Sequence, residues 1–160
     1  MFKQRSTPAQ ALQKAKHYCA YQERSHYDVK EKLYGYGLNR SEVEQLLSQL
    51  IEEDYLNEER FATGFARGHF KLKKWGRIKI EYGLKQKKVS SYNIKKAMKE
   101  IDDEEYEMVL LSIVTKKWNS LKAEQYINRM AKTSSYLLQK GYEPALVNKA
   151  ISLIRQKNIK

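Results

Sequence analysis

The chain has 160 residues, of which 41% are hydrophobic and 31% are charged, and it carries a formal net charge of +12. This length suits one domain or a short array of small modules, and the apolar content excludes a disordered polyampholyte. Only seven glycines and two prolines disfavour an all-β fold, which needs frequent turns, and a single cysteine excludes an intramolecular disulfide.

Helix starts are marked along the chain by side chains that cap a first turn. Thr7 stands before Pro8, and further capping residues with acidic partners stand at Asn39, Asn57 and Asp102. Apolar residues recur at intervals of three and four, and long strand-like alternation is absent. The sequence therefore predicts an all-α protein.

One set of apolar positions occurs three times. The first copy is Leu33, Leu38, Val43, Leu47 and Leu50. Shifts of 51 and then 53 residues give ten more apolar or aromatic residues: Leu84, Val89, Ile94, Met98, Ile101, Leu137, Tyr142, Val147, Ile151 and Ile154. This spacing describes the end of one helix, a tight turn and the buried face of the next helix.

The residue before each turn is expected to adopt a left-handed backbone. It is Gly37 in the first copy, Lys88 in the second and Gly141 in the third. Glycine suits such a helix end, whereas Lys88 should be strained by about 1 kcal/mol. The preceding helices of the first two copies also match, and Cys19 aligns with Phe70, so we expect Cys19 to be a small buried residue and not a nucleophile.

These patterns predict three tandem three-helix repeats that resemble helix-turn-helix units. We expect a flexible tail at residues 1–7, repeats at 8–55, 56–101 and 102–156, and a second tail at 157–160. In the third repeat the middle helix should start early, near Lys122. Because a lone bundle of this size has a marginal core, the repeats should pack on one another in an elongated, curved array.

The positive charge is concentrated in the middle repeat. Residues 1–56 carry 8 basic and 8 acidic residues, whereas residues 57–101 carry 13 basic against 4 acidic residues, a net +9. Such a cluster is typical of a protein with a polyanionic partner, with a solvated lysine surface as the alternative.

We predict a binding surface of eight cations in this segment. A helix from Glu58 to about Lys73 would place Arg60, Arg67, Lys71 and Lys74 within about 60° of one another. They would lie opposite an apolar face that includes Leu72. A turn at Trp75 joins that helix to the other four candidates. Trp75 itself could stack on bases or fill the joint between helices, and we favour the second interpretation. Arg60 has a structural alternative, a buried pair with Glu58 or Asp54. The eight candidates are Arg60, Arg67, Lys71, Lys74, Arg77, Lys79, Lys85 and Lys87.

No pattern favours an enzyme, a cofactor or a metal. A glycine-rich phosphate loop and a His-Glu-x-x-His motif are both absent. The three histidines are scattered, and the acidic run at 102–105 suits a helix N-terminus without any ion. A signal-peptide pattern and long apolar runs are also missing, so we expect a cytoplasmic protein with no membrane partner.

Two other classes of protein stay open. In a helix-turn-helix transcription regulator, the third helix of each repeat would read DNA; that helix is acidic in the first repeat, whereas in the second it carries Asn93, Lys95, Lys96 and Lys99. The other alternative is a helical adaptor whose partners are all proteins.

Two stretches of the chain resemble a known family. They are the segments Arg24–Leu33 and Tyr55–Ala62, and the second is followed by Phe65, Arg67, Gly76, Arg77, Ile78, Leu84, Lys87 and Val89. The chain resembles the RecX family, small cytoplasmic regulators of the RecA recombinase, over about residues 9 to 155. It departs from the family pattern at Lys88, where glycine is usual, and at Gly83, where the family tends to glutamate.

The resemblance implies three tandem three-helix units and a regulatory activity. It implies binding to RecA and to its filament on single-stranded DNA, in the filament groove, with inhibition of ATPase, strand-exchange and coprotease functions. Among the eight candidate cations it supports Arg60, Arg77 and Lys87 in particular. We therefore expect a monomeric, non-enzymatic RecA modulator with auxiliary affinity for DNA, single-stranded or double-stranded.

Overall fold

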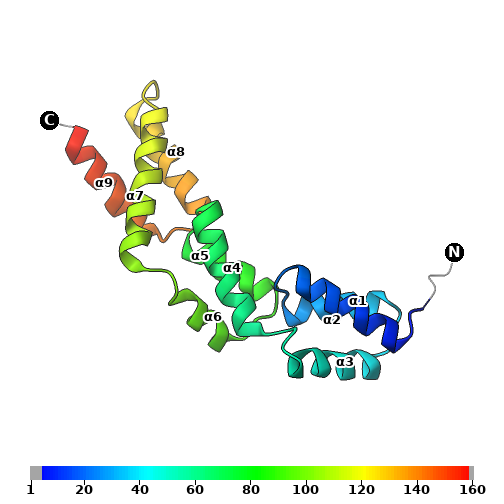
Figure 1. The fold of residues 1–160 in the computed structure, drawn as a ribbon. Helices are drawn as coiled ribbons and strands as arrows, with labels where there is room; N and C mark the ends of the chain where they lie inside the picture. Colours follow the sequence, from blue (N-terminus) through cyan, green and yellow to red (C-terminus); the bar gives the residue numbers. More distant parts are fainter. Residues whose placement is uncertain (1–4, 159–160) are drawn as a thin grey trace. The chain divides into compact units, whose positions relative to one another are not determined.

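The computed structural model describes residues 5–158, and within that range it contains nine α-helices and no strand (Figure 1). The helices are α1 (Pro8–Tyr21), α2 (His26–Gly35), α3 (Arg40–Glu52), α4 (Glu58–Lys73), α5 (Arg77–Gln86), α6 (Ser91–Met98), α7 (Asp103–Ser120), α8 (Tyr126–Gln139) and α9 (Pro144–Asn158). The prediction of an all-α protein is confirmed. In chain order, three helices fall in each of the three predicted repeats.

The helix starts follow the predicted capping residues. Thr7 and Asn39 each form a complete capping box with the side chain three residues on. The Asn57 side chain accepts a hydrogen bond from the Arg60 amide at 2.9 Å, and Asp102 caps α7 in the same way. Each cap satisfies an amide that the helix itself leaves unpaired, which explains why these helices begin where they do.

The turns between the last two helices of each repeat share one backbone conformation. Gly37, Lys88 and Gly141 have φ angles of +89°, +60° and +96°. The left-handed conformation predicted at all three places is confirmed, including at Lys88, where the side chain makes it unfavourable.

The chain divides into two compact units that do not coincide with the repeats. Unit 1 consists of Met1–Phe65 and Leu84–Ala97, and unit 2 consists of Ala66–Gly83 and Met98–Lys160. Helices α4 and α5 therefore contribute residues to both units. The elongated, curved array stays a prediction.

The core of unit 1 lies among α1, α2 and α3 and continues at Leu56. The alanines of α1 and Cys19 are buried in it, as the alignment of repeats predicts. At one position of the repeated set burial is incomplete: Leu47 and its equivalent Met98 are only half-buried, although Leu47 packs against the core, and the preceding Leu46 and Ala97 are buried.

In unit 2, helices α7, α8 and α9 lie side by side (Figure 1). Three buried aromatic rings contact one another in a row, with centroid distances of 5.7 Å from Phe70 to Tyr106 and 5.1 Å from Tyr106 to Tyr142. The predicted apolar face of α4 needs one correction, because Leu72 is 86% exposed. Leu72 is one residue from the helix end, and Phe70 is the last buried residue of that face.

Both chain ends differ from the predicted tails. Ser6 is buried, and its amide donates to the Tyr36 carbonyl at 3.0 Å, while Arg5 pairs with Glu42. Arg5 and Ser6 thus contact α3 and the residue that follows α2, Thr7 caps α1, and the rest of the predicted N-terminal tail lies outside the described residues. At the other end, α9 continues to Asn158, two residues beyond the predicted repeat.

The middle helix of the third repeat also starts later than predicted, at Tyr126 instead of near Lys122. Helix α7 runs on to Ser120, and turn residues separate it from α8.

Among the described residues, no helix combines the length and apolar content that a bilayer crossing needs.

Candidate functional site

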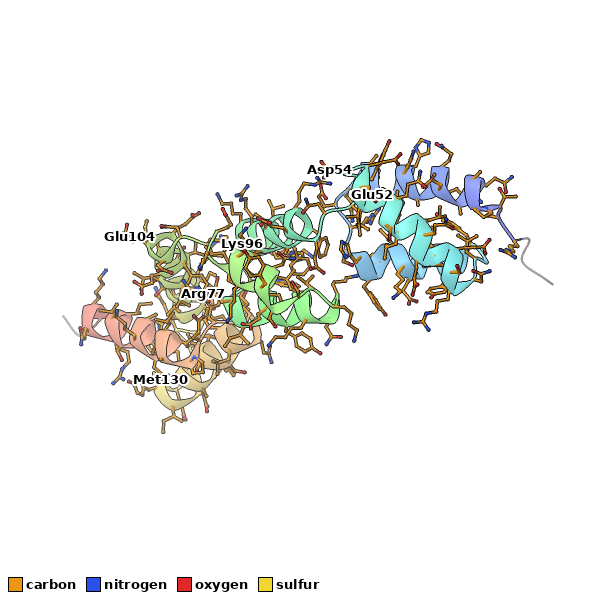
Figure 2. All side chains as sticks on the ribbon, turned by 90° about the horizontal axis from the view of Figure 1, so that it is seen from below. Glu52, Asp54, Arg77, Lys96, Glu104 and Met130 are labelled. Carbon is orange, nitrogen blue, oxygen red and sulfur yellow. The ribbon has the colours of Figure 1, made fainter. Side chains whose placement is uncertain are left out.

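Arg60 lies in the first turn of α4 and binds two acidic residues of the first repeat. Its Nε contacts Glu23, its Nη1 lies 3.1 Å from Asp54 Oδ1, and its Nη2 donates to the Asp54 carbonyl at 3.0 Å. The hydrogen bond to Glu23 raises the pKa of Arg60; the charge of Glu23 and the pairing with Asp54 add to this, and desolvation opposes it. Asp54, labelled in Figure 2, is thus a partner, but the pair is exposed and not buried as the structural alternative proposed, and Glu58 instead accepts from Asn93 at 2.7 Å.

Lys87 makes a second contact with the first repeat inside unit 1. Its Nζ lies 2.7 Å from Asp28 Oδ1, and Asp28 also completes the capping box at the start of α2. Because Asp28 is mostly buried, this ion pair is better shielded from water than an ordinary surface pair. Lys85, near the end of α5, is exposed.

Arg77, labelled in Figure 2, is the centre of a polar network in unit 2. Its guanidinium binds Asp103 and lies 3.0 Å from Glu143 Oε2, and it stacks 3.8 Å from the centroid of the Tyr106 ring. The Arg77 amide donates to the Tyr106 hydroxyl at 3.0 Å, and that hydroxyl donates to Glu143. Burial, and then the hydrogen bond to Glu143, raise the pKa of Tyr106.

Next to this network, two glycines bring main chains of the second and third repeats together. The Gly76 amide donates to the Lys140 carbonyl at 2.7 Å, and the Ile78 amide donates to the Gly141 carbonyl at 2.9 Å. A Cβ on Gly76 would lie 2.3 Å from the Gly141 carbonyl group, and a Cβ on Gly141 would lie 2.3 Å from Lys79 Cβ. Both positions therefore require glycine for close approach, and Gly141 requires it for its backbone conformation as well.

The three cations that the family pattern supports thus share one arrangement. Arg60, Arg77 and Lys87 each bind an acidic side chain of a neighbouring repeat. Arg67 is paired as well, with Glu100 at 3.2 Å inside unit 2. These four charges are at least partly neutralised within the protein.

The remaining candidates in unit 2 are Lys71, Lys74 and Lys79. Lys71 and Lys74 are exposed, and no carboxylate of residues 5–158 forms an ion pair with them. Because α4 ends at Lys73 and Lys74 has a φ of +57°, Lys74 leaves the regular helical series from which the basic stripe was predicted.

Trp75 has a structural environment with cations above its ring. It is half-buried, its ring lies 4.4 Å from the His69 ring, and its amide donates to the His69 carbonyl. Lys79 Nζ lies 4.5 Å and Lys73 Nζ 5.6 Å from the Trp75 centroid. The packing agrees with the favoured interpretation of Trp75 as a residue of the joint.

Apart from Asp54, sequence reasoning missed the acidic partners of the paired cations. Glu23 lies 37 residues from Arg60, Asp28 lies 59 residues from Lys87, and Glu143 lies 66 residues from Arg77. No local pattern marks such pairs. The only available signal was the alignment of the repeats. It shows the order of the repeats along the chain but not which of their side chains come into contact.

Two further predictions can be compared with the structure. Cys19 is buried, and burial is the largest cause of the raised pKa of its thiol, so the thiolate that a nucleophile needs is disfavoured. Across the described part of the chain, no three His, Cys, Asp or Glu side chains gather in a group that could hold a metal ion.

Comparison with known proteins gives consistent matches to one family. Residues 57–98 match the model described as the second three-helix domain of RecX, and residues 103–151 match the model of its third three-helix domain. A "Regulatory protein RecX" of Prosthecochloris aestuarii is 27% identical over 146 residues, which cover 91% of this chain and 94% of that protein. The RecX protein of Lactobacillus gasseri is 34% identical over 104 residues, which cover 65% of this chain and 38% of the relative.

Solved structures show the same fold. The crystal structure of RecX from Lactobacillus salivarius superposes with a TM-score of 0.84 at 20% identity, covering 93% of this chain and 97% of that one. A second structure, described as regulatory protein RecX, gives a TM-score of 0.78 at 21% identity and covers 91% and 73% of the two chains.

Fold and matches together define a class of helical protein built from tandem three-helix domains. Within that class, the chain belongs to the RecX family. It spans only 38% of the length of the Lactobacillus gasseri relative and 56% of an Oceanobacillus iheyensis relative that is 22% identical.

Proposed function

We propose that this protein is a non-enzymatic regulator that binds RecA and RecA filaments on single-stranded DNA. It occupies the filament groove as a monomer in the cytoplasm and inhibits the ATPase, recombinase and coprotease activities. Membership of a family whose members are named regulatory proteins carries the proposal. The net charge of +9 in residues 57–101 supports an additional, non-specific affinity for DNA.

The eight candidate cations have two roles in this proposal. Lys71, Lys74 and Lys79 make the direct contacts to the filament or its DNA, and the exposed Lys85 is a further candidate for such a contact. Arg60, Arg67, Arg77 and Lys87 hold their acidic partners, so they act mainly by fixing the surfaces that carry the lysines. We expect loss of Arg77 or Lys87 to lower stability as well as binding, because their carboxylate partners are partly buried and would lose a partner there, whereas loss of the exposed Arg67 should change stability little.

The test is RecA hydrolysing ATP on single-stranded DNA, with this protein added at ratios well below one per RecA. We expect the rate of ATP hydrolysis and the length of the filaments, seen by electron microscopy, to fall together. A Lys71→Gln/Lys74→Gln variant should inhibit less at the same concentration. An unchanged ATPase rate and filament length with the wild-type protein would overturn the proposal.

The same preparation separates the two alternative functions. A transcription regulator would prefer one duplex sequence strongly over others, because base contacts discriminate and phosphate contacts do not. A purely protein-binding adaptor would show no DNA affinity that depends on salt. We expect neither behaviour.

A further inference from the structure

A pocket of about 310 Å³ in unit 2 is lined by four lysines. It lies between α7 and α8, next to the end of α4, and its cationic side chains are Lys74, Lys116, Lys117 and Lys140. Three of the four belong to the third repeat, outside the segment in which the sequence concentrates its charge. The hydroxyls of Ser112 and Ser120 and the ring of Tyr136 complete the polar lining.

The charges in this pocket are not balanced from within the protein. No acidic residue lines it, and none of the four lysines forms an ion pair with a carboxylate of the described residues. The acidic residues at the start of α7, among them Asp102 and Glu104, line a different hollow, which shares Lys74 and Ser112 with the pocket. Four neighbouring ammonium groups repel one another, and a bound anion relieves that repulsion.

The pocket also has an aromatic surface beside its cations. Tyr136 is 37% exposed, and Lys117 Nζ and Lys140 Nζ lie 4.6 Å and 5.7 Å from its ring centroid. Sites for single-stranded nucleic acid combine these two elements, since cations hold the phosphates while an aromatic ring stacks on a base. A site for an acidic peptide would need the cations but not the exposed ring.

Part of the pocket is held in place by the surrounding main chain. The Lys74 carbonyl accepts a hydrogen bond from the buried Tyr142 hydroxyl at 2.8 Å, and Lys140 Nζ lies 3.3 Å from the Lys73 carbonyl. The Ser120 hydroxyl donates to the Lys117 carbonyl at 2.6 Å. These contacts fix the segments from which the lysines project, so less conformational freedom is lost when an anion binds.

We propose that this pocket binds a phosphodiester group of single-stranded DNA, with an adjacent base on Tyr136. The inference deepens the DNA affinity of the proposed function by naming a site for it. The volume lies at the low end for small-ligand pockets, about 300 to 1,000 Å³, so it suits one nucleotide unit. The third repeat thereby contributes to DNA binding through residues that the middle repeat's charge did not indicate.

The experiment measures binding of a fluorescent oligo(dT) to the full chain by anisotropy, without RecA, over a series of salt concentrations. We expect Lys116→Gln/Lys117→Gln to weaken binding and to reduce the salt slope by about 1.4, which is roughly 0.7 for each lost phosphate contact. The matched control is Lys122→Gln/Lys149→Gln, which removes the same charge from exposed positions of unit 2 outside the pocket. Its slope should stay that of the wild type.

A second pair of variants tests the aromatic contact. Tyr136→Ala should weaken oligo(dT) binding by about fivefold or more, whereas Tyr136→Phe keeps the ring and should bind as the wild type does. Thermal melting by circular dichroism confirms that each variant folds. Equal weakening by the pocket and control lysine variants would overturn the inference, as would a Tyr136→Ala variant that folds and binds normally.

Competitors distinguish the source of the anion. Inorganic phosphate and polyglutamate should displace the oligonucleotide only at concentrations far above those of unlabelled oligo(dT). Displacement by either one at similar phosphate or carboxylate concentrations would overturn the assignment to nucleic acid. Since RecA is absent, a failed RecA assay with pocket-dependent oligo(dT) binding would contradict the proposed RecA regulation and support the pocket.

Discussion

Gly76 shows how little space separates the second repeat from the third. Its position would place a Cβ 2.3 Å from the carbonyl carbon and oxygen of Gly141 and 2.4 Å from the Tyr142 amide nitrogen. All of these are main-chain atoms, which cannot turn aside as a flexible side chain can. The joint therefore depends on the absence of a single methyl group.

We expect Gly76→Ala to lower the free energy of unfolding by about 2 kcal/mol or more, because the backbones must move apart to accept the methyl group. Urea denaturation followed by circular dichroism measures the change. Gly64→Ala is the matched control, since nothing lies within 4 Å of the added Cβ and Gly64 lies within α4. That variant should gain about 0.5 to 1 kcal/mol. Similar stability of the two variants would contradict the close approach.

At this scale the sequence did not show what most of the candidate cations contact, and their role in binding stays a prediction. Arg60 and Arg77 were singled out as cations for a partner, yet each binds carboxylates within the chain. Asp54 lies near Arg60 in the sequence and was proposed, but Glu23 and Glu143 lie 37 and 66 residues from their cations and meet them only when the repeats pack. Cys19 was predicted correctly because burial follows from its place in the repeated helix.

Helices and turns followed the sequence closely because their signals are local. Caps act within three residues, and a helix end marked by Gly37 or Gly141 needs no information from elsewhere. The exception is the start of α8, where Gln125 is the N-cap and its side chain makes no capping hydrogen bond. Without a capping side chain, the predicted helix began about four residues too early.

The turn at Lys88 offers a test of backbone strain at the end of a helix. Lys88 has a φ of +60° at the place where the other two repeats have glycine. We expect Lys88→Gly to raise the free energy of unfolding by up to about 1 kcal/mol, because glycine adopts this conformation without a Cβ clash. Guanidinium denaturation measures the gain.

Lys88→Ala is the control for the lost side chain. Alanine also removes the charge but keeps the Cβ, so this variant should show little or none of the gain. If alanine stabilises the protein as much as glycine does, repulsion among lysines is responsible and backbone strain is not.

For the whole molecule, the three repeats and the family resemblance predicted the class of protein, whereas the polyanionic partner indicated by the uneven charge stays a prediction. The distribution of that charge was less predictable. At least four of the eight candidate cations in the middle repeat are paired with acids, whereas three lysines of the pocket, which form no ion pair with a carboxylate of residues 5–158, lie in the third repeat. Charge counts along a chain do not show which charges are neutralised after folding.

The net charge of +9 in residues 57–101 leads to a prediction for the binding of long single-stranded DNA. Lys71→Gln/Lys74→Gln should reduce the salt slope by about 1.4, since each contacted phosphate contributes roughly 0.7. The measurement is titration of fluorescent DNA at several salt concentrations.

The control, Lys30→Gln/Lys122→Gln, removes two exposed lysines outside the middle repeat and should leave the slope unchanged. An identical slope for wild type and both variants would remove the middle repeat from DNA binding.

The contact between residues 76–78 and 140–141 is made by main-chain atoms, which every amino acid possesses. Apart from its two glycines, such a connection places few demands on the identity of the side chains around it. Sequences can therefore drift far while the geometry of the connection is inherited unchanged. The RecX structure from Lactobacillus salivarius keeps the same fold with a TM-score of 0.84 at 20% identity.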